Sequence, residues 1–138
     1  MRPALLLDTC ALIRIMNNAD LSPTAVQYID EAYDRGEAVY ASPITAWEIG
    51  LQAAKGRFKS ILTPQRWLEE LLRTPNMKLA ELTPQILLES SFLPGSPPRD
   101  PADRIIIATA REFGLAVVTR DRALLEYAND GYLHAVAC

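Results

Sequence analysis

The chain has 138 residues, of which 49% are hydrophobic and 22% are charged, and its formal net charge is −3. This length and composition predict one globular domain with a buried core, and they exclude a disordered or low-complexity chain. The acidic charge balance argues against a protein that holds nucleic acid through a broad basic face, but it is compatible with a local basic rim around an acidic centre.

Proline and glycine mark the expected helix boundaries. At several points a residue that favours the helix N-cap precedes a proline: Ser22-Pro23, Ser42-Pro43, Thr63-Pro64, Thr83-Pro84 and Asp100-Pro101. Proline is well tolerated at the first helical position, because the N–H that it lacks would have no helical partner there. Gly36, Gly56 and Gly114 mark helix ends, where glycine readily adopts a positive φ.

In chain order, the predicted elements are a strand at 4–8, helices at 9–17 and 23–35, a strand at 38–42, helices at 43–55 and 64–73, a strand at 77–82, helices at 84–92 and 101–113, a strand at 115–119, a helix at 122–129 and a strand at 132–136. Short, nearly continuous apolar strands are typical of a parallel sheet covered on both faces. The alternation predicts an α/β fold, a three-layer α/β/α sandwich with a central, mainly parallel sheet of about five strands. We expect one domain spanning residues 1–138.

The apolar runs are too short for a membrane span, which needs ~20 residues, and the apolar start of the chain is cut off by an acid at Asp8. Because a secretory signal needs a longer apolar region, we expect a cytoplasmic protein with no membrane partner. The chain has two cysteines and a single histidine, which are too few for a disulfide framework or a zinc site. We expect Cys10 and Cys138 to be free thiols, with Cys10 packed as a small hydrophobe.

Two acids stand where strands of the predicted sheet end. Asp8 closes the first strand, and Asp121 follows the fourth strand by two residues. Ligands of open parallel sheets bind outside the carboxyl ends of the strands, so both acids are candidates for a site. Either acid could instead serve only as the N-cap of the helix that follows it, and the sequence leaves both interpretations open.

Glu48 lies in the most apolar helical stretch of the chain, where Ile44, Trp47 and Leu51 share one face at helical spacing. We expect that face, including Trp47, in the core or an interface, with Glu48 at its border. A carboxylate there is unfavourable unless it is paired or bound to a metal. A solvated glutamate at the edge of the face is the alternative.

Two further acids begin the helix predicted at 101–113. Asp100 is its expected N-cap, and Asp103 falls in the first turn, where the helix dipole favours an acid for structural reasons alone. The apolar run Ile105–Ala108 predicts a buried helix, which would bring Asp103 close to the sheet end where Asp8 and Asp121 are expected. Several carboxylates in one place repel one another unless a hard divalent cation, Mg²⁺ or alternatively Mn²⁺, binds between them. Such a site can activate water and polarise a phosphate, which implies phosphodiester hydrolysis.

Other folds with acids at strand ends fit less well. A phosphatase of the haloacid type needs a second aspartate two residues after the first, where this chain has Cys10. A response-regulator receiver needs a lysine after a late strand, whereas Thr119, Arg120 and Asp121 follow the apolar run here.

Four segments resemble, in order and spacing, the motifs of the PIN-domain family, and most closely those of the VapC-like toxins of bacterial toxin–antitoxin modules. They are Leu5–Ile13, Ser42–Ile49, Arg99–Ala110 and Val117–Asp121. One departure is Pro98-Arg99, where relatives often carry a histidine before the Asp-Pro pair.

The resemblance implies that the catalytic and metal-binding acids are Asp8, Glu48, Asp103 and Asp121. It further implies a Mg²⁺-dependent endoribonuclease that cuts RNA, a cognate antitoxin protein as partner, and a homodimer. The alternative is a catalytically weak PIN scaffold that acts as a protein-binding module.

Residues beside the four acids are expected to support them or to contact RNA: Thr9, Asp100, Arg104, Thr119 and Arg120. The resemblance matches Thr119 to a small hydroxyl residue near the metal and leaves Asp100 as a cap or supporting group. The arginines could bind RNA phosphates or pair with neighbouring acids. Lys55, Arg57 and Lys59 follow the Glu48 helix and could form a basic rim for RNA.

Overall fold

The computed structural model describes residues 2–138, in which strands and helices alternate along the chain. In chain order the elements are β1 (Leu5–Leu7), α1 (Thr9–Met16), α2 (Pro23–Asp34), β2 (Val39–Ala41), α3 (Ile44–Ala54), α4 (Pro64–Arg73), β3 (Met77–Leu79), α5 (Pro84–Glu89), α6 (Pro101–Phe113), β4 (Ala116–Thr119), α7 (Arg122–Asn129) and β5 (His134–Ala137). Among residues 2–138, no helix combines the length and the apolarity that a membrane crossing requires.

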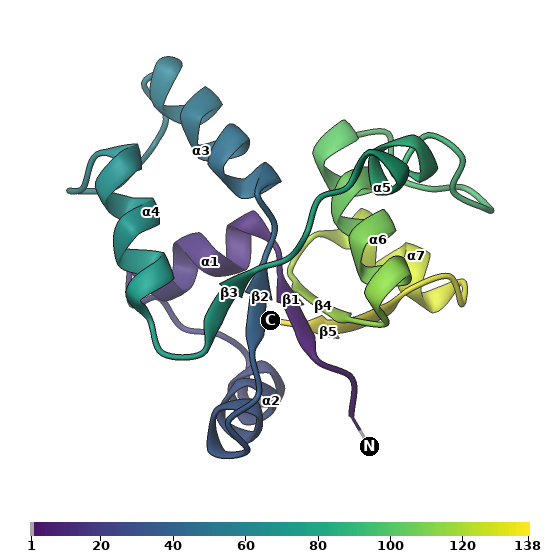
Figure 1. The fold of residues 1–138 in the computed structure, drawn as a ribbon, viewed down its shortest axis with the longest axis horizontal. Coiled ribbons are helices and arrows are strands. Elements are labelled where there is room, and N and C mark those ends of the chain that lie inside the picture. Colours follow the sequence, from purple (N-terminus) through teal and green to yellow (C-terminus); the bar gives the residue numbers. More distant parts are fainter. Residues whose placement is uncertain (1) are drawn as a thin grey trace.

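The strands form one five-stranded, wholly parallel sheet in the order β3-β2-β1-β4-β5 (Figure 1). Leu7 of β1 pairs with Ala41 of β2 on one side and with Val118 of β4 on the other. The chain builds the sheet outward from β1 to β3 and then returns to the opposite side of β1 for β4 and β5. The direction of the connections therefore reverses between β1 and β4, which is where open parallel sheets form a binding crevice.

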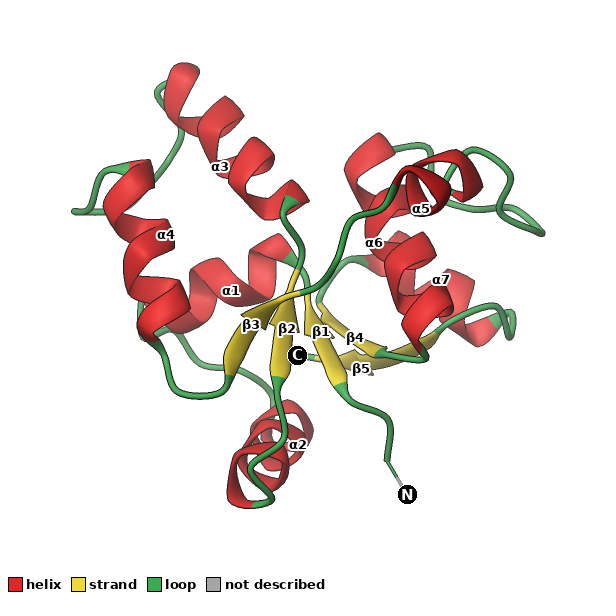
Figure 2. Ribbon diagram, in the orientation of Figure 1, coloured by secondary structure: helices red, strands yellow, loops and turns green. Residues whose placement is uncertain are grey.

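Alternate residues of the strands enter two separate cores. Leu5 and Leu7 of β1 pack with buried side chains of α1, α2, α3 and α4, whereas Leu6 packs with those of α6 and α7. Figure 2 shows helices on both sides of the strands. Successive side chains of a strand point to opposite faces of the sheet, and helices cover both faces here. The α/β/α sandwich expected from the alternating pattern is thus confirmed.

Most of the predicted helix starts are confirmed by their caps. The side-chain oxygens of Ser22, Thr63, Thr83 and Asp100 each accept a hydrogen bond from the N–H three residues later. Ser42 differs, because its hydroxyl accepts from the N–H of Ile44 at 3.1 Å and α3 begins one residue later than expected.

The last strand lies later in the chain than the sequence predicts. β5 begins at His134, which pairs with Ala116 of β4, and Tyr132 instead stacks on Tyr127 of α7 with ring centroids 5.2 Å apart. The pairing register of β4 sets where β5 starts, and an isolated apolar pattern carries no information about that register. The helix expected at 84–92 likewise ends at Glu89 and continues as turns.

The apolar face expected for α3 enters the core only at Ile44, which is partly buried there, and the core expectation is wrong for Trp47 and Leu51. Thr45 and Ile49 are the residues buried against the core, while Trp47 is 53% and Leu51 39% exposed. The hydroxyl of Thr45 makes a buried hydrogen bond of 2.9 Å to that of Thr9 in α1, so this side of α3 faces the fold. The Trp47 side is consequently turned outward.

Candidate functional site

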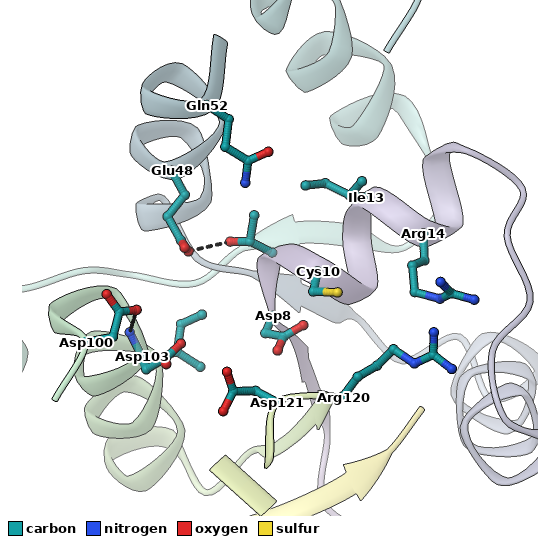
Figure 3. Close-up of a pocket in the computed structure, with 12 residues that line it drawn as sticks. Asp8, Cys10, Ile13, Arg14, Glu48, Gln52, Asp100, Asp103, Arg120 and Asp121 are labelled. Atoms are coloured by element: carbon teal, nitrogen blue, oxygen red, sulfur yellow. Dashed lines mark hydrogen bonds between the residues drawn. The ribbon is translucent and has the colours of Figure 1, made fainter. Parts of the chain in front are cut away.

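A pocket of about 560 Å³ opens beyond the carboxyl ends of β1 and β4 (Figure 3). The carboxylates that line it are Asp8, Glu48, Asp100, Asp103 and Asp121. They come from the end of β1, from α3, from the start of α6 and from the turn after β4. Segments distant in sequence therefore meet between β1 and β4, where the direction of the strand connections reverses. The structure brings together all four acids that the sequence singled out, with Asp100 beside them.

Asp8 is buried directly after β1, and its N–H donates to the carbonyl of Val118 at 3.1 Å. One carboxylate oxygen accepts from the N–H of Ala11 at 2.8 Å and caps α1, and the other accepts from the hydroxyl of Thr119. Burial raises the pKa of Asp8, and these two hydrogen bonds oppose that rise. Asp8 is therefore a helix cap and a pocket residue at once.

Asp121 also combines the two roles. Its Oδ1 accepts from the N–H of Leu124 at 3.1 Å and caps α7, while its own N–H donates to the hydroxyl of Thr119 at 3.0 Å. Thr119, fully buried at the end of β4, thus connects Asp8 to Asp121 through a single hydroxyl. This connection fixes the two acids on either side of the β1–β4 boundary.

Glu48 reaches the pocket from α3. Its Oε1 accepts a hydrogen bond of 2.6 Å from the hydroxyl of Thr9, the residue after Asp8. Burial raises the pKa of Glu48, the bond from Thr9 lowers it, and the nearby charges of Asp100 and Asp8 raise it again. Glu48 is half-buried and held in place, which does not fit a freely solvated surface glutamate.

Asp103 is strongly perturbed by its surroundings. It lies in the first turn of α6, where its N–H donates to a carboxylate oxygen of Asp100 at 3.2 Å. Burial raises the pKa of Asp103 to about 7, with further contributions from the charges of Asp100, Asp121, Glu48 and Asp8. Without a cation in the pocket, this carboxyl holds its proton to a much higher pH than an ordinary aspartate does.

The residues expected to support the acids divide into two groups. Thr9, Asp100 and Arg120 line the pocket, and Thr119 is buried beneath it. Arg104 lies outside the lining, and its Nε donates to the carbonyl of Pro98 at 2.7 Å, so this arginine braces the loop before α6.

Five lining residues were not identified from the sequence as parts of a site: the apolar Ile13 and Ile106, and also Cys10, Arg14 and Gln52. Arg14 lies four residues after Cys10 in α1, and Gln52 lies four residues after Glu48 in α3. Residues at that spacing share a helix face, so the spacing from Glu48 could have found Gln52, whereas Arg14 is one turn from Cys10, which was not itself assigned to the site. Cys10 is a free thiol, as expected, but it is exposed at the pocket and not packed as a hydrophobe. Partial burial raises the pKa of its thiol, and so does the charge of Asp8.

The donor chemistry of the pocket fits a hard divalent cation, because its acidic ligands are all oxygen. Within residues 2–138, however, no three His, Cys, Asp or Glu side chains are gathered into one compact coordination group. Mg²⁺ typically keeps several waters and binds one or two carboxylates directly. The spread of acids around this pocket fits that mode of binding better than an enclosed protein cage.

The family model for the PIN domain matches residues 5–130. The chain belongs to the PIN-domain family. This PIN domain is 32% identical over 94 residues to ribonuclease VapC22 of Mycobacterium tuberculosis, an overlap of 68% of this chain and 71% of that protein. The resemblance inferred from the four motifs is thereby confirmed.

Two solved structures have the same fold. VapBC2 from Rickettsia felis, bound to a DNA fragment from its promoter, has a chain that superposes with a TM-score of 0.67 at 13% identity, covering 97% of this chain and 98% of that one. A toxin–antitoxin complex from Klebsiella pneumoniae gives a TM-score of 0.63 at 22% identity, covering 96% of each chain. At these identities the likeness concerns the fold alone.

Proposed function

We propose that this PIN domain is a Mg²⁺-dependent endoribonuclease that hydrolyses RNA phosphodiester bonds, with Mn²⁺ as an alternative metal. The observation that carries the proposal is one pocket lined by Asp8, Glu48, Asp103 and Asp121. It lies at the β1–β4 boundary, where the direction of the strand connections reverses. The raised pKa of Asp103 supports it, because crowded acids with perturbed pKa values are typical of catalytic sites. The identity with a named ribonuclease supports the choice of RNA.

The four acids are the residues that would hold the metal. When bound, the metal would neutralise charge on the scissile phosphate and lower the pKa of a water molecule. The protein's own part is to position these carboxylates: the Thr119 hydroxyl fixes Asp8, and the Thr9 hydroxyl fixes Glu48. With no metal bound, burial raises the pKa of Asp103 to about 7, so metal binding near neutral pH would release a proton from this carboxyl.

We further propose that the chain is the toxin of a toxin–antitoxin pair, acting in the cytoplasm as a homodimer. The toxin role is supported by the likeness to VapC22 and to the fold of a chain in a toxin–antitoxin complex. Expression of the chain with and without the neighbouring open reading frame tests this role. Growth arrest only when the chain is expressed alone is the expected result, and equal growth in both cases would contradict it.

A cleavage assay tests the catalytic proposal. RNA should be cut in Mg²⁺, left intact in EDTA and cut again when Mg²⁺ is restored in excess. Asp103→Asn should remove this activity, whereas Asp100→Ser keeps a cap oxygen for α6 and should cut nearly as the parent does. Loss of cutting in Asp100→Ser but not in Asp103→Asn would exchange the roles of these two acids.

The same assay separates the enzyme from the alternative, a catalytically weak PIN scaffold that binds proteins. A scaffold would show no cleavage that depends both on Mg²⁺ and on Asp103. Capture of the antitoxin without any such cleavage would favour the scaffold.

A further inference from the structure

A second, smaller cavity adjoins the acidic pocket along α3. It has a volume of about 230 Å³ and shares Glu48, Gln52 and Asp100 with the acidic pocket. Its other residues include an aromatic side chain and two cations, which are Trp47, Lys55 and Arg57. Sites for drug-sized ligands usually measure ~300–1,000 Å³, so the size of this cavity suits a smaller group.

The two tryptophans of the chain have opposite environments. Trp67 is fully buried in the core and packs edge-on against Phe58, with ring centroids 6.1 Å apart. Trp47 is 53% exposed on the outward side of α3 and lines the cavity. Because the core face of α3 is made by Thr45 and Ile49, Trp47 does not serve the core. Its ring is available to a ligand.

Cations without carboxylate partners lie on two sides of the acids. Lys55 and Arg57 are exposed at the end of α3 and form no ion pair within residues 2–138. Figure 3 shows Arg14 and Arg120 across the acids from Glu48 and Gln52. The guanidinium groups of Arg14 and Arg120 donate to backbone carbonyls and, among the described residues, form no ion pair with an acid. A polyanion lying across the acidic pocket would therefore meet positive charge at both ends of its path.

We propose that the Trp47 cavity binds the nucleotide next to the scissile phosphate of single-stranded RNA. Trp47 stacks on the base, and Lys55 and Arg57 contact phosphates of the same strand. This inference rests on the proposed ribonuclease function and names its substrate as unpaired RNA. A duplex keeps its base faces stacked inside the helix, whereas an unpaired base can lie on an aromatic ring.

The charges around the cavity favour a nucleotide over a peptide. Glu48 and Asp100 would repel an acidic peptide, and Lys55 and Arg57 would repel a basic one. A nucleotide carries a neutral base with N–H donors beside an anionic phosphate, so it can match both sets of charges. The volume of about 230 Å³ is in keeping with one base.

Binding of short single-stranded RNA oligomers, followed by fluorescence anisotropy in Ca²⁺ with intact RNA verified afterwards, tests the proposal. Trp47→Ala should weaken binding at least about fivefold, the lower end of the range for base–aromatic stacking. Trp47→Phe keeps a stacking ring and should bind within about twofold of the parent. Tyr33→Ala is the matched control, because Tyr33 is 54% exposed but lies on α2, away from the pocket, and it should change nothing. Melting temperatures of all variants check that each one is folded.

Abasic substitution identifies the base that Trp47 contacts. One abasic position in the oligomer should weaken binding to the parent about as much as Trp47→Ala does. Trp47→Ala should then be insensitive to that position, as expected for two partners of one contact. Equal losses at every abasic position in both proteins would overturn the stacking contact.

Salt dependence tests the two cations. Lys55→Gln and Arg57→Gln should each reduce the slope of log affinity against log salt by about 0.7, the value for one phosphate on a single strand. Lys78→Gln, an exposed control in β3, should leave the slope unchanged. Unaltered slopes in Lys55→Gln and Arg57→Gln would show that neither side chain contacts an RNA phosphate.

The outcomes separate this inference from the proposed function. If the parent cuts RNA and Trp47→Ala binds and cuts equally well, the subsite is refuted and the ribonuclease stands. If Trp47 governs RNA binding but no Mg²⁺-dependent cutting occurs, the subsite stands and the catalytic proposal fails. If Trp47→Ala keeps RNA binding but loses the protein encoded by the neighbouring reading frame, the cavity is a protein interface and the inference is overturned. A parent that binds no single-stranded RNA also overturns it.

Discussion

The carboxylate of Asp121 has two oxygens, and the hydrogen bond that caps α7 engages only Oδ1. Asp121→Asn keeps a capping oxygen and should leave the free energy of unfolding in EDTA nearly unchanged. Asp121→Ala removes the cap and should lower it by about 0.5–2 kcal/mol. Both variants should lose Mg²⁺-dependent RNA cleavage, because neither side chain carries the negative charge. Urea denaturation and cleavage rates measure the two effects, and an Asp121→Asn variant that cuts like the parent would leave Asp121 as a cap alone.

Asp103 makes the metal-free protein sensitive to pH. Its pKa rises from 3.8, the ordinary value for an aspartate, to about 7 in the fold, mainly because of burial. A raised pKa stabilises the folded state fully below about pH 3.8, and this contribution is lost as the pH rises through about 7. Relative to Asp103→Asn, which cannot ionise, the melting temperature of the parent in EDTA should therefore fall across this range.

Mg²⁺ should oppose that loss. The metal competes with the proton for the same oxygens, so it should raise the melting temperature of the parent more at pH 8 than at pH 5. Thermal melts across pH, with and without Mg²⁺, measure both effects. Parallel pH profiles for the parent and Asp103→Asn in EDTA would show that Asp103 does not carry the sensitivity.

At the scale of elements, the end of β4 holds two acids through one buried hydroxyl. Thr119→Val removes this hydroxyl without changing the shape of the side chain, and it should cost about 1–3 kcal/mol of stability, because polar partners lose a hydrogen bond. We expect kcat for RNA cleavage to fall about tenfold with KM little changed, since the variant affects positioning of the acids and not RNA binding. Denaturant melts and steady-state kinetics measure these changes.

Thr109→Val is the matched control for Thr119→Val. Thr109 is equally buried, but its hydroxyl donates to the carbonyl of Ile105 in its own helix, at 2.8 Å. Its loss should leave cleavage unchanged. Similar kinetics in the two valine variants would show that Thr119 does not position the acids.

The bounds of elements that are set by neighbouring residues in the chain could be predicted from the sequence. β4 is a buried apolar run, and α6 has its cap, its proline and its terminal glycine in the expected places, with Gly114 at φ +66°. Because the ends of such elements fix where the next residues lie, the sequence alone places Asp8, Asp103 and Asp121 near one another. The parallel pairing of β1 with β4 then brings them to one edge of the sheet.

The orientation of α3 could not be predicted in this way. Its sequence offers an apolar face with Trp47 and Leu51, but the hydrogen bond between Thr45 and Thr9 and the burial of Ile49 turn another side inward. The outcome depends on which neighbours the helix meets, and hydrophobic periodicity does not report those neighbours. The exposure of Trp47 and of Cys10 follows from the same kind of tertiary contact.

At the scale of the whole molecule, apolar side chains gather at the end of α5. Leu88 is 67% and Phe92 82% exposed, and Phe92 borders a cavity against α6. Large exposed apolar side chains in one place are typical of interfaces, and a homodimer would cover them. Leu88→Glu combined with Phe92→Glu should shift the mass in solution from two chains to one, as measured by light scattering after size exclusion.

Ile61→Glu serves as the control for the dimer variant, because Ile61 is also an exposed apolar residue but lies between α3 and α4. It should leave the oligomeric state unchanged. A parent protein that is monomeric at micromolar concentration would contradict the homodimer.

The double role of Asp8 and Asp121 has a consequence for how the family diverges. A lineage that no longer needed hydrolysis would still be under selection to cap α1 and α7, since each carboxylate accepts a helix N–H. Such a lineage should keep these acids or exchange them for Asn or Ser. Glu48 and Asp103 cap no helix, so both should drift before Asp8 and Asp121 do. Among homologues, a missing Glu48 beside an intact Asp8 would then mark descendants that have lost activity.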